Sequence, residues 1–311
     1  MRGMRAIVRE PEGPRLVERP ELAPGADEVV VDVAFAGVCR SDLAAADGAI
    51  AVAPGHILGH ELAGRVRAIG GGVRGLAAGD PVTVIPFWPC GACAACAAGG
   101  RCAAPRWLGV DEDGAFAERV RAPAAAVVRL PPGLGLRRGA YVEPVAAALG
   151  VLPFIERGAR VLVWGRGRIA ELTARVAAAH GAVVARAGEA GEGAGGAGFS
   201  GAGFDVAIEH GGGDPAAMLA ALRPGGALIL KSRARRPIAL DAGELVARDL
   251  VVRGASHGSF PAAIDWLHGA AIDDLLAPPR PLEAFAEVFA AERAGEARKQ
   301  MFAIAPGLER G

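Results

Sequence analysis

The sequence predicts an α/β protein whose two parts are built differently. Short valine-rich segments broken by Gly, Pro and Asp fill roughly the first 130 residues, a pattern typical of antiparallel or barrel-like strands. From about residue 145, apolar runs alternate with segments suited to helices, which indicates a doubly wound parallel sheet. A chain of 311 residues is long enough for both parts to be domains.

Composition excludes several classes of protein. Hydrophobic residues make up 52% of the chain and charged residues 22%, which excludes a disordered polyelectrolyte. Lys+Arg and Asp+Glu both total 34, so neither nucleic acid nor an anionic membrane is the expected partner. No apolar run approaches the roughly 18 residues needed to span a bilayer, and the first ten residues lack the apolar core of a signal peptide. We therefore expect a cytoplasmic protein.

The individual elements follow from local patterns. Strands are expected at 28–35, 63–69 and 81–85 in the first part, and at 160–164, 182–185, 205–209, 227–231 and 250–253 in the second. A helix is expected at 169–180, and helices and loops after Ser256. Three prolines at 278, 279 and 281 indicate a connection. Residues 187–203 contain eight glycines in seventeen positions, which predicts a flexible loop.

Four of the five cysteines form a compact cluster with the spacing C-x2-C-x2-C-x5-C. They are Cys90, Cys93, Cys96 and Cys102. Four thiolates supply the tetrahedral shell of a structural zinc ion. The alternative is four free cysteines in an alanine-rich loop, whereas disulfides are not expected without an export signal.

The remaining cysteine, Cys39, is the first member of a second candidate group with His60 and Glu61. A thiolate, an imidazole and a carboxylate suit a zinc ion that keeps a position open for water or substrate. Taken alone, a single Cys and a single His are more often structural. The interpretation of this group as a zinc site therefore depends on the other motifs of the chain.

A glycine-rich turn follows the apolar run 160–164. Residues 165–170 read G-x-G-x-x-A and precede the expected helix, the context that a dinucleotide-binding turn requires. Gly165 allows the tight turn, Gly167 lets the backbone approach a pyrophosphate, and the small Ala170 allows the helix to pack closely on the strand. The positive end of the helix favours the phosphate charge.

With these motifs in this order, the chain resembles the medium-chain dehydrogenase/reductase family, specifically its zinc-containing alcohol and polyol dehydrogenases. The motifs that carry the resemblance are Cys39-Arg40-Ser41-Asp42, Gly59-His60-Glu61, Gly79-Asp80, the four-cysteine cluster, Glu143-Pro144, the glycine turn and Gly295-Glu296. The resemblance implies a GroES-like catalytic domain at 1–145, completed by 258–311, and a Rossmann domain at 146–257. It also implies a homodimer or homotetramer, with 228–230 and 250–252 as candidates for the joining edge.

The resemblance also implies roles for individual residues. Cys39 and His60 would ligate a catalytic zinc, with Glu61 as a ligand or exchangeable neighbour and Glu143 as the third protein ligand of polyol-type members. Asp42 would orient the His60 ring, and Ser41 would take the proton of the substrate hydroxyl. The residues expected to face the cofactor are Arg40, Gly165, Gly167, Arg168, Ile169, Arg186 and Lys299. Two zinc ions per chain are expected, one catalytic and one structural.

The sequence departs from the family pattern in the proton relay, where Ala44 stands in place of a histidine. His56 is one candidate to complete the relay, although a packed or exposed histidine is the simpler interpretation. Trp88 and Trp107 are candidates for the wall of the substrate pocket or for the core. In the cysteine cluster the last gap is five residues rather than seven.

The region expected to bind the cofactor departs from the family pattern as well. The acidic residue expected about 20 positions after Gly165 is missing, and the strand instead ends Ala185-Arg186. An arginine there suits a 2′-phosphate, which favours NADP(H) over NAD(H), unless Arg186 is only a solvated surface residue. Between 185 and 205 the family usually places further elements, so the nucleotide domain is expected to be shorter by one unit.

The leading expectation is therefore a zinc-dependent oxidoreductase. It would transfer hydride between NADP(H), or NAD(H), and a secondary alcohol or ketone, with Glu143 pointing to a polyol or sugar-like substrate. One alternative keeps the scaffold but reduces a C=C or C=N bond without zinc chemistry. The other is a degenerate member that binds without catalysing a reaction.

Overall fold

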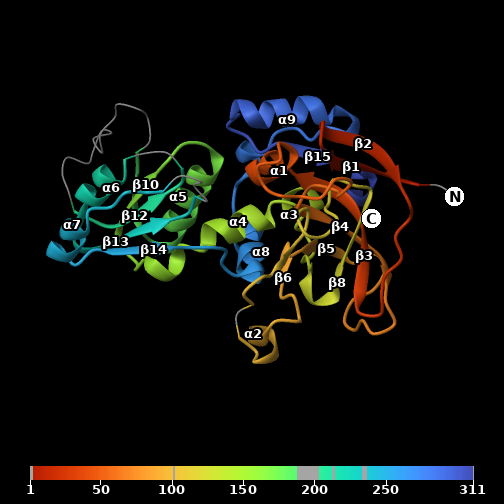
Figure 1. Cartoon of the computed structure of the whole chain (residues 1–311), viewed down its shortest axis with the longest axis horizontal. Helices are drawn as coiled ribbons and strands as arrows, with labels where there is room; N and C mark the ends of the chain where they lie inside the picture. The colour runs from red at the N-terminus through yellow and green to blue at the C-terminus, as the bar shows by residue number, and fades with distance from the viewer. Residues whose placement is uncertain (1–2, 101, 188–202, 212–213, 233–236, 311) are drawn as a thin grey trace. The chain divides into compact units, whose positions relative to one another are not determined.

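The computed structural model describes residues 3–100, 102–187, 203–211, 214–232 and 237–310, which form two compact units (Figure 1). Unit 1 comprises Met1–Glu143 and Ile264–Gly311, and unit 2 comprises Pro144–Ala263. Within the described ranges, none of the helices has the length and apolar character needed to cross a membrane. The glycine-rich segment predicted as a loop falls, at 188–202, outside the described residues.

Unit 1 is built on antiparallel strands. A hairpin pairs β1 (Met4–Glu10) with β2 (Gly13–Arg19). A six-stranded sheet has the order β15-β3-β4-β5-β9, with β8 also pairing β3. Its strands are β3 (Glu28–Gly37), β4 (Glu61–Ile69), β5 (Pro81–Val84), β8 (Arg119–Pro123), β9 (Val127–Arg129) and β15 (Met301–Ala303). The valines of β3 are buried because this strand lies inside the sheet.

Short elements complete unit 1. A two-stranded ribbon joins β6 (Phe87–Trp88) to β7 (Arg106–Trp107). The helices within unit 1 are α1 (Arg40–Ala46), α2 (Ala94–Ala97), α3 (Leu136–Gly139) and α9 (Phe285–Ala294). Two more helices include residues of both units: α4 (Val142–Leu149) begins in unit 1, and α8 (Phe260–Gly269) begins in unit 2. As predicted, 278–281 form a connection rather than a helix. The core gathers valines of β3 with Phe116, Phe289 and Phe302.

The described residues of unit 2 form a parallel sheet of five strands in the order β11-β10-β12-β13-β14. The strands are β10 (Arg160–Trp164), β11 (Val183–Ala187), β12 (Phe204–Glu209), β13 (Leu222–Leu230) and β14 (Val251–Gly254). Its helices are α5 (Arg168–His180), α6 (Pro215–Ala221) and α7 (Ala242–Ala247). Two apolar clusters, one with Ala170 and one with Met218, pack on the sheet. The predicted α/β class with a parallel sheet is confirmed.

Two expectations need correction. Residues 228–230 are not at an edge, because β13 is hydrogen-bonded between β12 and β14; in the described sheet the edge strand on that side is β14. The short strand β15 was not predicted, since three residues are too few to show an alternating pattern. It pairs Phe302 with Ala36, so the end of the chain completes the sheet begun by β3.

Candidate active site and metal centres

Cys39, His60 and Glu61 come together in unit 1. One ligand atom of each, the thiol, an imidazole nitrogen and a carboxylate oxygen, lies within 4.8 Å of the other two. Cys39 caps the start of α1, while His60 directly precedes β4 and Glu61 begins it. The separation of the three ligand atoms and their chemistry fit a zinc ion. His60 and Glu61 are buried, whereas Cys39 is partly exposed.

Asp42 connects two members of this group. One carboxylate oxygen accepts a hydrogen bond from the Cys39 amide at 2.8 Å, and the other lies 2.9 Å from Nδ1 of His60. A proton on Nδ1 satisfies the second contact and leaves Nε2 to act as a ligand. Burial lowers the pKa of His60, but Asp42 and Cys39 outweigh burial and raise the pKa well above its usual value.

Glu61 is held by an ion pair that sequence reasoning did not predict. Lys299 Nζ donates to Glu61 Oε1 at 2.5 Å, and both side chains are 1% exposed. Glu61 Oε2 finds no hydrogen-bond partner in the described part of the chain. Burial raises the pKa of Glu61 to about 7; Glu143 adds to the rise, while Lys299 and His60 oppose it. The predicted role of Lys299 towards a cofactor phosphate stays a prediction.

Two glycines make room for the group. A Cβ at Gly37 would lie 2.2 Å from Oε2 of Glu61, so only glycine fits beside this carboxylate. Gly59 has a φ of +96°, and a Cβ there would lie 2.4 Å from the Phe116 ring. Sequence reasoning missed Gly37; its only signal was its place two residues before Cys39.

The other residues predicted for the active site lie outside the group of Cys39, His60 and Glu61. Glu143, at the start of α4, is buried and close enough to Glu61 to raise its pKa, but it is not in the group whose ligand atoms gather within 4.8 Å. Ser41 is half-buried and Arg40 exposed, both in the first turn of α1. The Trp107 ring lies 6.0 Å from the His60 ring, edge to face, whereas Trp88 packs against the core.

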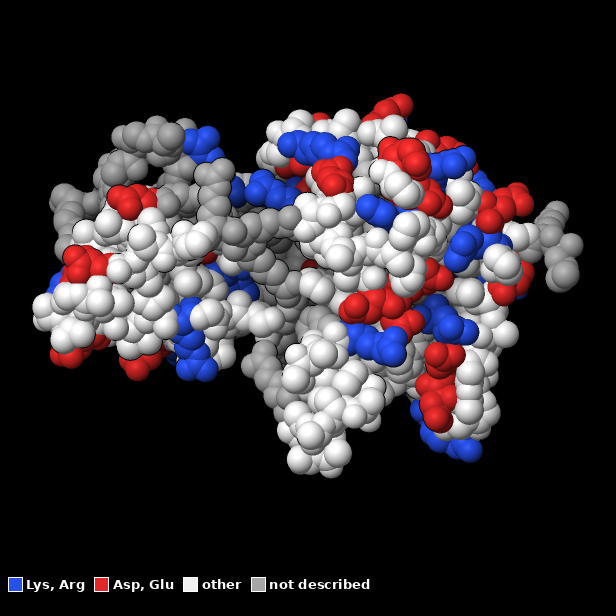
Figure 2. Space-filling model, viewed as in Figure 1, with Lys and Arg blue, Asp and Glu red and all other residues white. Residues whose placement is uncertain are grey.

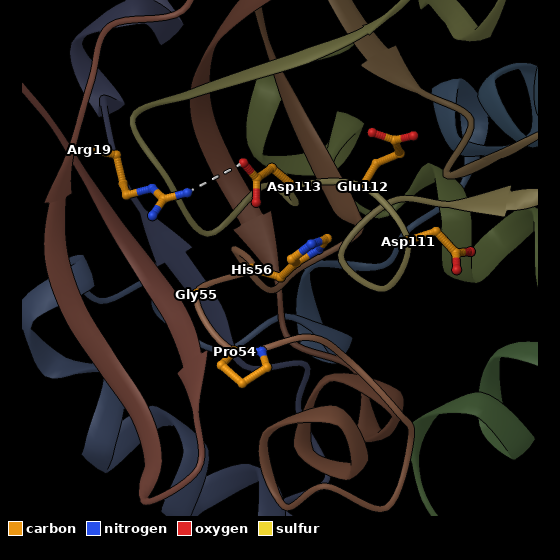
Figure 3. Close-up of a pocket in the computed structure, with 7 residues that line it drawn as sticks. All are labelled: Arg19, Pro54, Gly55, His56, Asp111, Glu112 and Asp113. Atoms are coloured by element: carbon orange, nitrogen blue, oxygen red, sulfur yellow. Dashed lines mark ion pairs between the residues drawn. The ribbon is translucent and has the colours of Figure 1, made fainter.

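His56 lies in a surface pocket of about 410 Å³. Figure 3 shows the residues that line it, with Arg19 directed towards Asp113 across a 3.9 Å ion pair. His56 does not belong to either described group of potential metal ligands. The carboxylates of the pocket are engaged locally: Asp113 accepts from the Ile57 amide at 3.0 Å, and Glu112 pairs with Arg106 at 2.5 Å.

The four remaining cysteines form a separate lobe around α2. All four thiols lie within 4.8 Å of one another, and three of the sulfur pairs are separated by 4.0, 3.5 and 3.9 Å. Tetrahedral coordination with Zn–S bonds of about 2.3 Å requires sulfurs about 3.8 Å apart. The shortened last gap therefore still brings Cys102 to the other three, and the thiols fit a zinc ion.

The surroundings of the lobe favour thiolates at some positions. Amide donors, first those of Ala103 and Cys96, lower the pKa of Cys93 to about 6, while neighbouring thiols raise that of Cys96 to about 12. Arg101 is the only Lys, Arg, Asp or Glu in residues 89–105. Figure 2 shows the lobe as a group of uncharged side chains. Because this segment has a single charged residue and no large apolar side chain, a metal ion bound by the four thiolates would be the main source of local stability.

The glycine turn of unit 2 has the geometry of a phosphate-binding turn. It follows β10 and leads into α5, with φ values of +142° at Gly165 and +85° at Gly167. No atom of the described residues lies within 4 Å of a Cβ built at Gly167, so these residues leave the backbone at the start of the helix open to a ligand. Ala170 is fully buried against the sheet. Arg168 is buried, and Ile169 is half-buried.

Arg186 lies on β11, the strand beside β10. Its side chain is 42% exposed and pairs with Glu171 of α5, which also pairs with Arg175 at 2.8 Å. The guanidinium of Arg186 is thus held by Glu171 but remains partly exposed to solvent. The preference for NADP(H) that was inferred from this residue stays a prediction.

Residues 25–132 match the family model described as "Alcohol dehydrogenase GroES-like domain". The chain is 34% identical over 214 residues to sorbitol dehydrogenase of Halalkalibacterium halodurans, which covers 66% of this chain and 62% of that protein. A 2-dehydro-3-deoxy-L-galactonate 5-dehydrogenase of Pseudoalteromonas atlantica is 35% identical over 54% of this chain. The chain spans 62% and 51% of the lengths of these two curated relatives.

Solved structures match over nearly the whole chain. A zinc-binding dehydrogenase from Sinorhizobium meliloti 1021 bound to NADP has a TM-score of 0.85 and 25% identity, covering 97% of this chain and 100% of that one. Galactitol-1-phosphate dehydrogenase from Escherichia coli gives a TM-score of 0.84 and 25% identity, covering 96% and 100%.

The fold and the matches define a GroES-like domain joined to a Rossmann-type parallel sheet. The chain is similar to zinc-type alcohol and polyol dehydrogenases of the medium-chain dehydrogenase/reductase family. The family resemblance drawn from the sequence motifs is thereby confirmed.

Proposed function

We propose that this chain is a zinc-dependent oxidoreductase that transfers hydride between NADP(H) and a secondary alcohol or ketone. The observation that carries the proposal is the gathering of Cys39, His60 and Glu61 within 4.8 Å, with Asp42 bonded to two of them. In this proposal residues 1–145 and 258–311 form the catalytic domain, and 146–257 form the nucleotide domain. The named activities of the relatives support oxidation of an alcohol.

Cys39 and His60 are the proposed protein ligands of the catalytic zinc, with Glu61 as a neighbour that can also ligate. Glu143 is the proposed additional ligand and would need to approach the group. A bound zinc supplies Lewis acidity, which lowers the pKa of an alcohol. The lobe of Cys90, Cys93, Cys96 and Cys102 would hold the second, structural zinc.

The chain's own residues then have separate tasks. Asp42 fixes the Nδ1 proton of His60 and so keeps Nε2 available as a ligand. Ser41 is the proposed acceptor of the substrate hydroxyl proton, and it returns the proton when a ketone is reduced. Ala44 provides no side chain to continue the relay, so we propose that water takes the proton from Ser41. Trp107, beside His60, is the proposed wall of the substrate pocket.

Unit 2 would hold the dinucleotide, whose nicotinamide supplies or accepts the hydride. The proposed cofactor residues are Gly165, Gly167, Arg168 and Ile169 at the turn, Arg186 at the end of β11, and Arg40 and Lys299 from unit 1. Preference for NADP(H) rests on Arg186, a cation at the position where an acid would otherwise bind the ribose hydroxyls. Arg186 keeps exposed donors besides its contact with Glu171.

A polyol or sugar-like alcohol is the proposed substrate class, supported by Glu143 and by the names of the relatives. The proposed homodimer would form through the edge strand β14, where Val251 is 52% exposed.

The test combines metal analysis with turnover. Purified chain should contain two zinc ions and produce NADPH with a panel of polyols that includes sorbitol and galactitol 1-phosphate. Cys39→Ser should lose one zinc ion and all turnover, whereas Cys102→Ser should lose the other zinc and resistance to proteolysis of the lobe. Full activity of Cys39→Ser would remove the metal mechanism. Failure of the wild-type protein to bind either nicotinamide cofactor would remove the proposal as a whole.

A further inference from the structure

His210 occupies a position in unit 2 that the proposed mechanism leaves without a role. It directly follows β12, and its amide donates to the Trp164 carbonyl at the end of β10, at 2.8 Å. A Cβ built on Gly165 would lie 2.9 Å from the Cβ of His210. The side chain of His210 therefore stands beside the first glycine of the turn.

This is the point of the sheet where ligands bind in parallel folds. From β10 the chain adds β11 on one side, and from β12 onwards it builds the other side. The crevice at the carboxyl ends of strands on either side of such a reversal is the usual ligand site. His210 is the residue at the carboxyl end of β12, immediately across from the turn.

The imidazole has an unsatisfied atom there. Nε2 of His210 is shielded from solvent and has no hydrogen-bond partner in the described part of the chain. A buried polar atom without a partner is costly unless a ligand satisfies it. The neighbouring acid does not do so, because the Glu209 carboxylate is taken by the Gly211 amide and by the amide and hydroxyl of Ser232.

We propose that the His210 imidazole is a cofactor-binding side chain that hydrogen-bonds a ribose hydroxyl of the dinucleotide at the glycine turn. This inference rests on the proposed function. Glu209 supports it indirectly, since its bonds to the residues after β12 and β13 hold the segment that carries His210.

The electrostatics favour a hydroxyl over a phosphate as the partner. Burial, followed by Lys231 and Arg186, lowers the pKa of His210 to about 3, so the ring is neutral near pH 7. A neutral imidazole offers one N–H and one lone pair. A ribose hydroxyl both donates and accepts and so fits either ring tautomer, whereas a phosphate oxygen only accepts.

Three variants separate hydrogen bonding from packing. His210→Phe keeps a ring without polar atoms, His210→Gln keeps a donor and an acceptor, and His180→Gln changes the histidine at the far end of α5, which contacts the Ile155 carbonyl. Loss of one hydrogen bond should weaken binding of NADPH by about tenfold in His210→Phe. His210→Gln should retain most of the affinity, and His180→Gln all of it. Affinity is measured by fluorescence titration, and folding by thermal unfolding.

A second readout does not depend on catalysis. The chain has six histidines, so ¹⁵N imidazole spectra are simple, and the resonance absent from His210→Phe identifies His210. Adding NADPH should move its Nε2 signal. Titration with ADP separates the two riboses, because a loss of ADP affinity in His210→Phe places the contact on the adenosine side, and a loss seen only with NADPH places it on the nicotinamide side.

Equal binding of both ligands by wild type and His210→Phe, or an unmoved Nε2 signal, would overturn the inference while leaving the proposed function intact. Absence of cofactor binding by the wild type would overturn both.

Discussion

Lys299 and Glu61 form a buried ion pair between residues 238 positions apart, with Nζ and Oε1 separated by 2.5 Å. Both side chains are 1% exposed, so neither charge is compensated by water. Removing one partner leaves the other charge buried alone, which costs about 3–5 kcal/mol in known cases. The candidate site is thus coupled to the stability of unit 1.

We expect Lys299→Met to lower the free energy of unfolding by several times the effect of Arg293→Ala. Arg293 pairs with Asp47 at the surface, and exposed pairs contribute about 1 kcal/mol or less. The double variant Lys299→Met/Glu61→Gln should recover part of the loss, because no charge is then stranded. Urea unfolding at neutral pH measures all four proteins. Equal losses of unfolding free energy in Lys299→Met and Arg293→Ala would show that the buried pair contributes no more stability than the surface pair.

Asp42→Asn should weaken zinc binding at the candidate catalytic centre by about 10–100-fold, because the residue orients the ligand ring and the Cys39 backbone. Chelator competition gives the affinity, and thermal unfolding checks the fold. Asp47→Asn, at the exposed end of the same helix, is the matched control and should change neither. An unchanged zinc affinity in Asp42→Asn would argue against the orienting role.

Gly37→Ala should destabilise the chain by about 1–3 kcal/mol, the range for overpacked sites. The new methyl would lie 2.2 Å from Oε2 of Glu61 and 2.9 Å from Cε of Lys299, so the ion pair has to move. Gly71→Ala is the control, since nothing lies within 4 Å of its Cβ. The comparison is made by denaturant unfolding, and similar stabilities for the two variants would contradict the expected crowding.

Asp205 is expected to contribute stability that depends on pH. Partial burial raises its pKa, but the hydrogen bonds from Arg223 and from the Arg160 amide outweigh burial, and the net pKa lies below the ordinary value for an aspartate. A pKa that is lower in the folded state stabilises the fold above the unfolded pKa, and this contribution is lost as pH falls through the folded pKa. The stability difference between wild type and Asp205→Asn should therefore be constant near neutral pH and shrink below about pH 4.

Denaturant unfolding at several pH values tests this, with Glu156→Gln, an exposed carboxylate of the same unit, as the control. A difference that grows on acidification would show that the sign is wrong.

Sequence patterns predicted much of the fold because its strands are long enough to show them. The run at 160–164 was placed at the bounds that the structure gives, and the helix after the glycine turn to within one residue. The other motifs and the family resemblance, rather than spacing alone, indicated that Cys39, His60 and Glu61 belong together, and the structure brings their candidate ligand atoms within 4.8 Å. Of the two candidates for the joining edge, 250–252 overlaps the edge strand β14, whereas 228–230 lies on the internal strand β13, because strand order depends on connections rather than on composition.

The missed features depend on contacts between distant parts of the chain. The pairing of Lys299 with Glu61 and the closeness of His210 to Gly165 leave no periodic signal, since each depends on how separate strands align. Gly37 is required by the position of a carboxylate that arrives from another strand.

The placement of β15 beside β3 has a consequence for how the protein is made. Unit 2 is contiguous in sequence, so it can fold as soon as its last strand has left the ribosome. Unit 1 must wait for Met301–Ala303 and for Lys299 before its sheet and its buried carboxylate are complete. Nascent chains in which residues 299–303 have not left the ribosome should therefore hold a folded unit 2 and an unfinished unit 1, so the group of Cys39, His60 and Glu61 is fixed only after Lys299 has emerged.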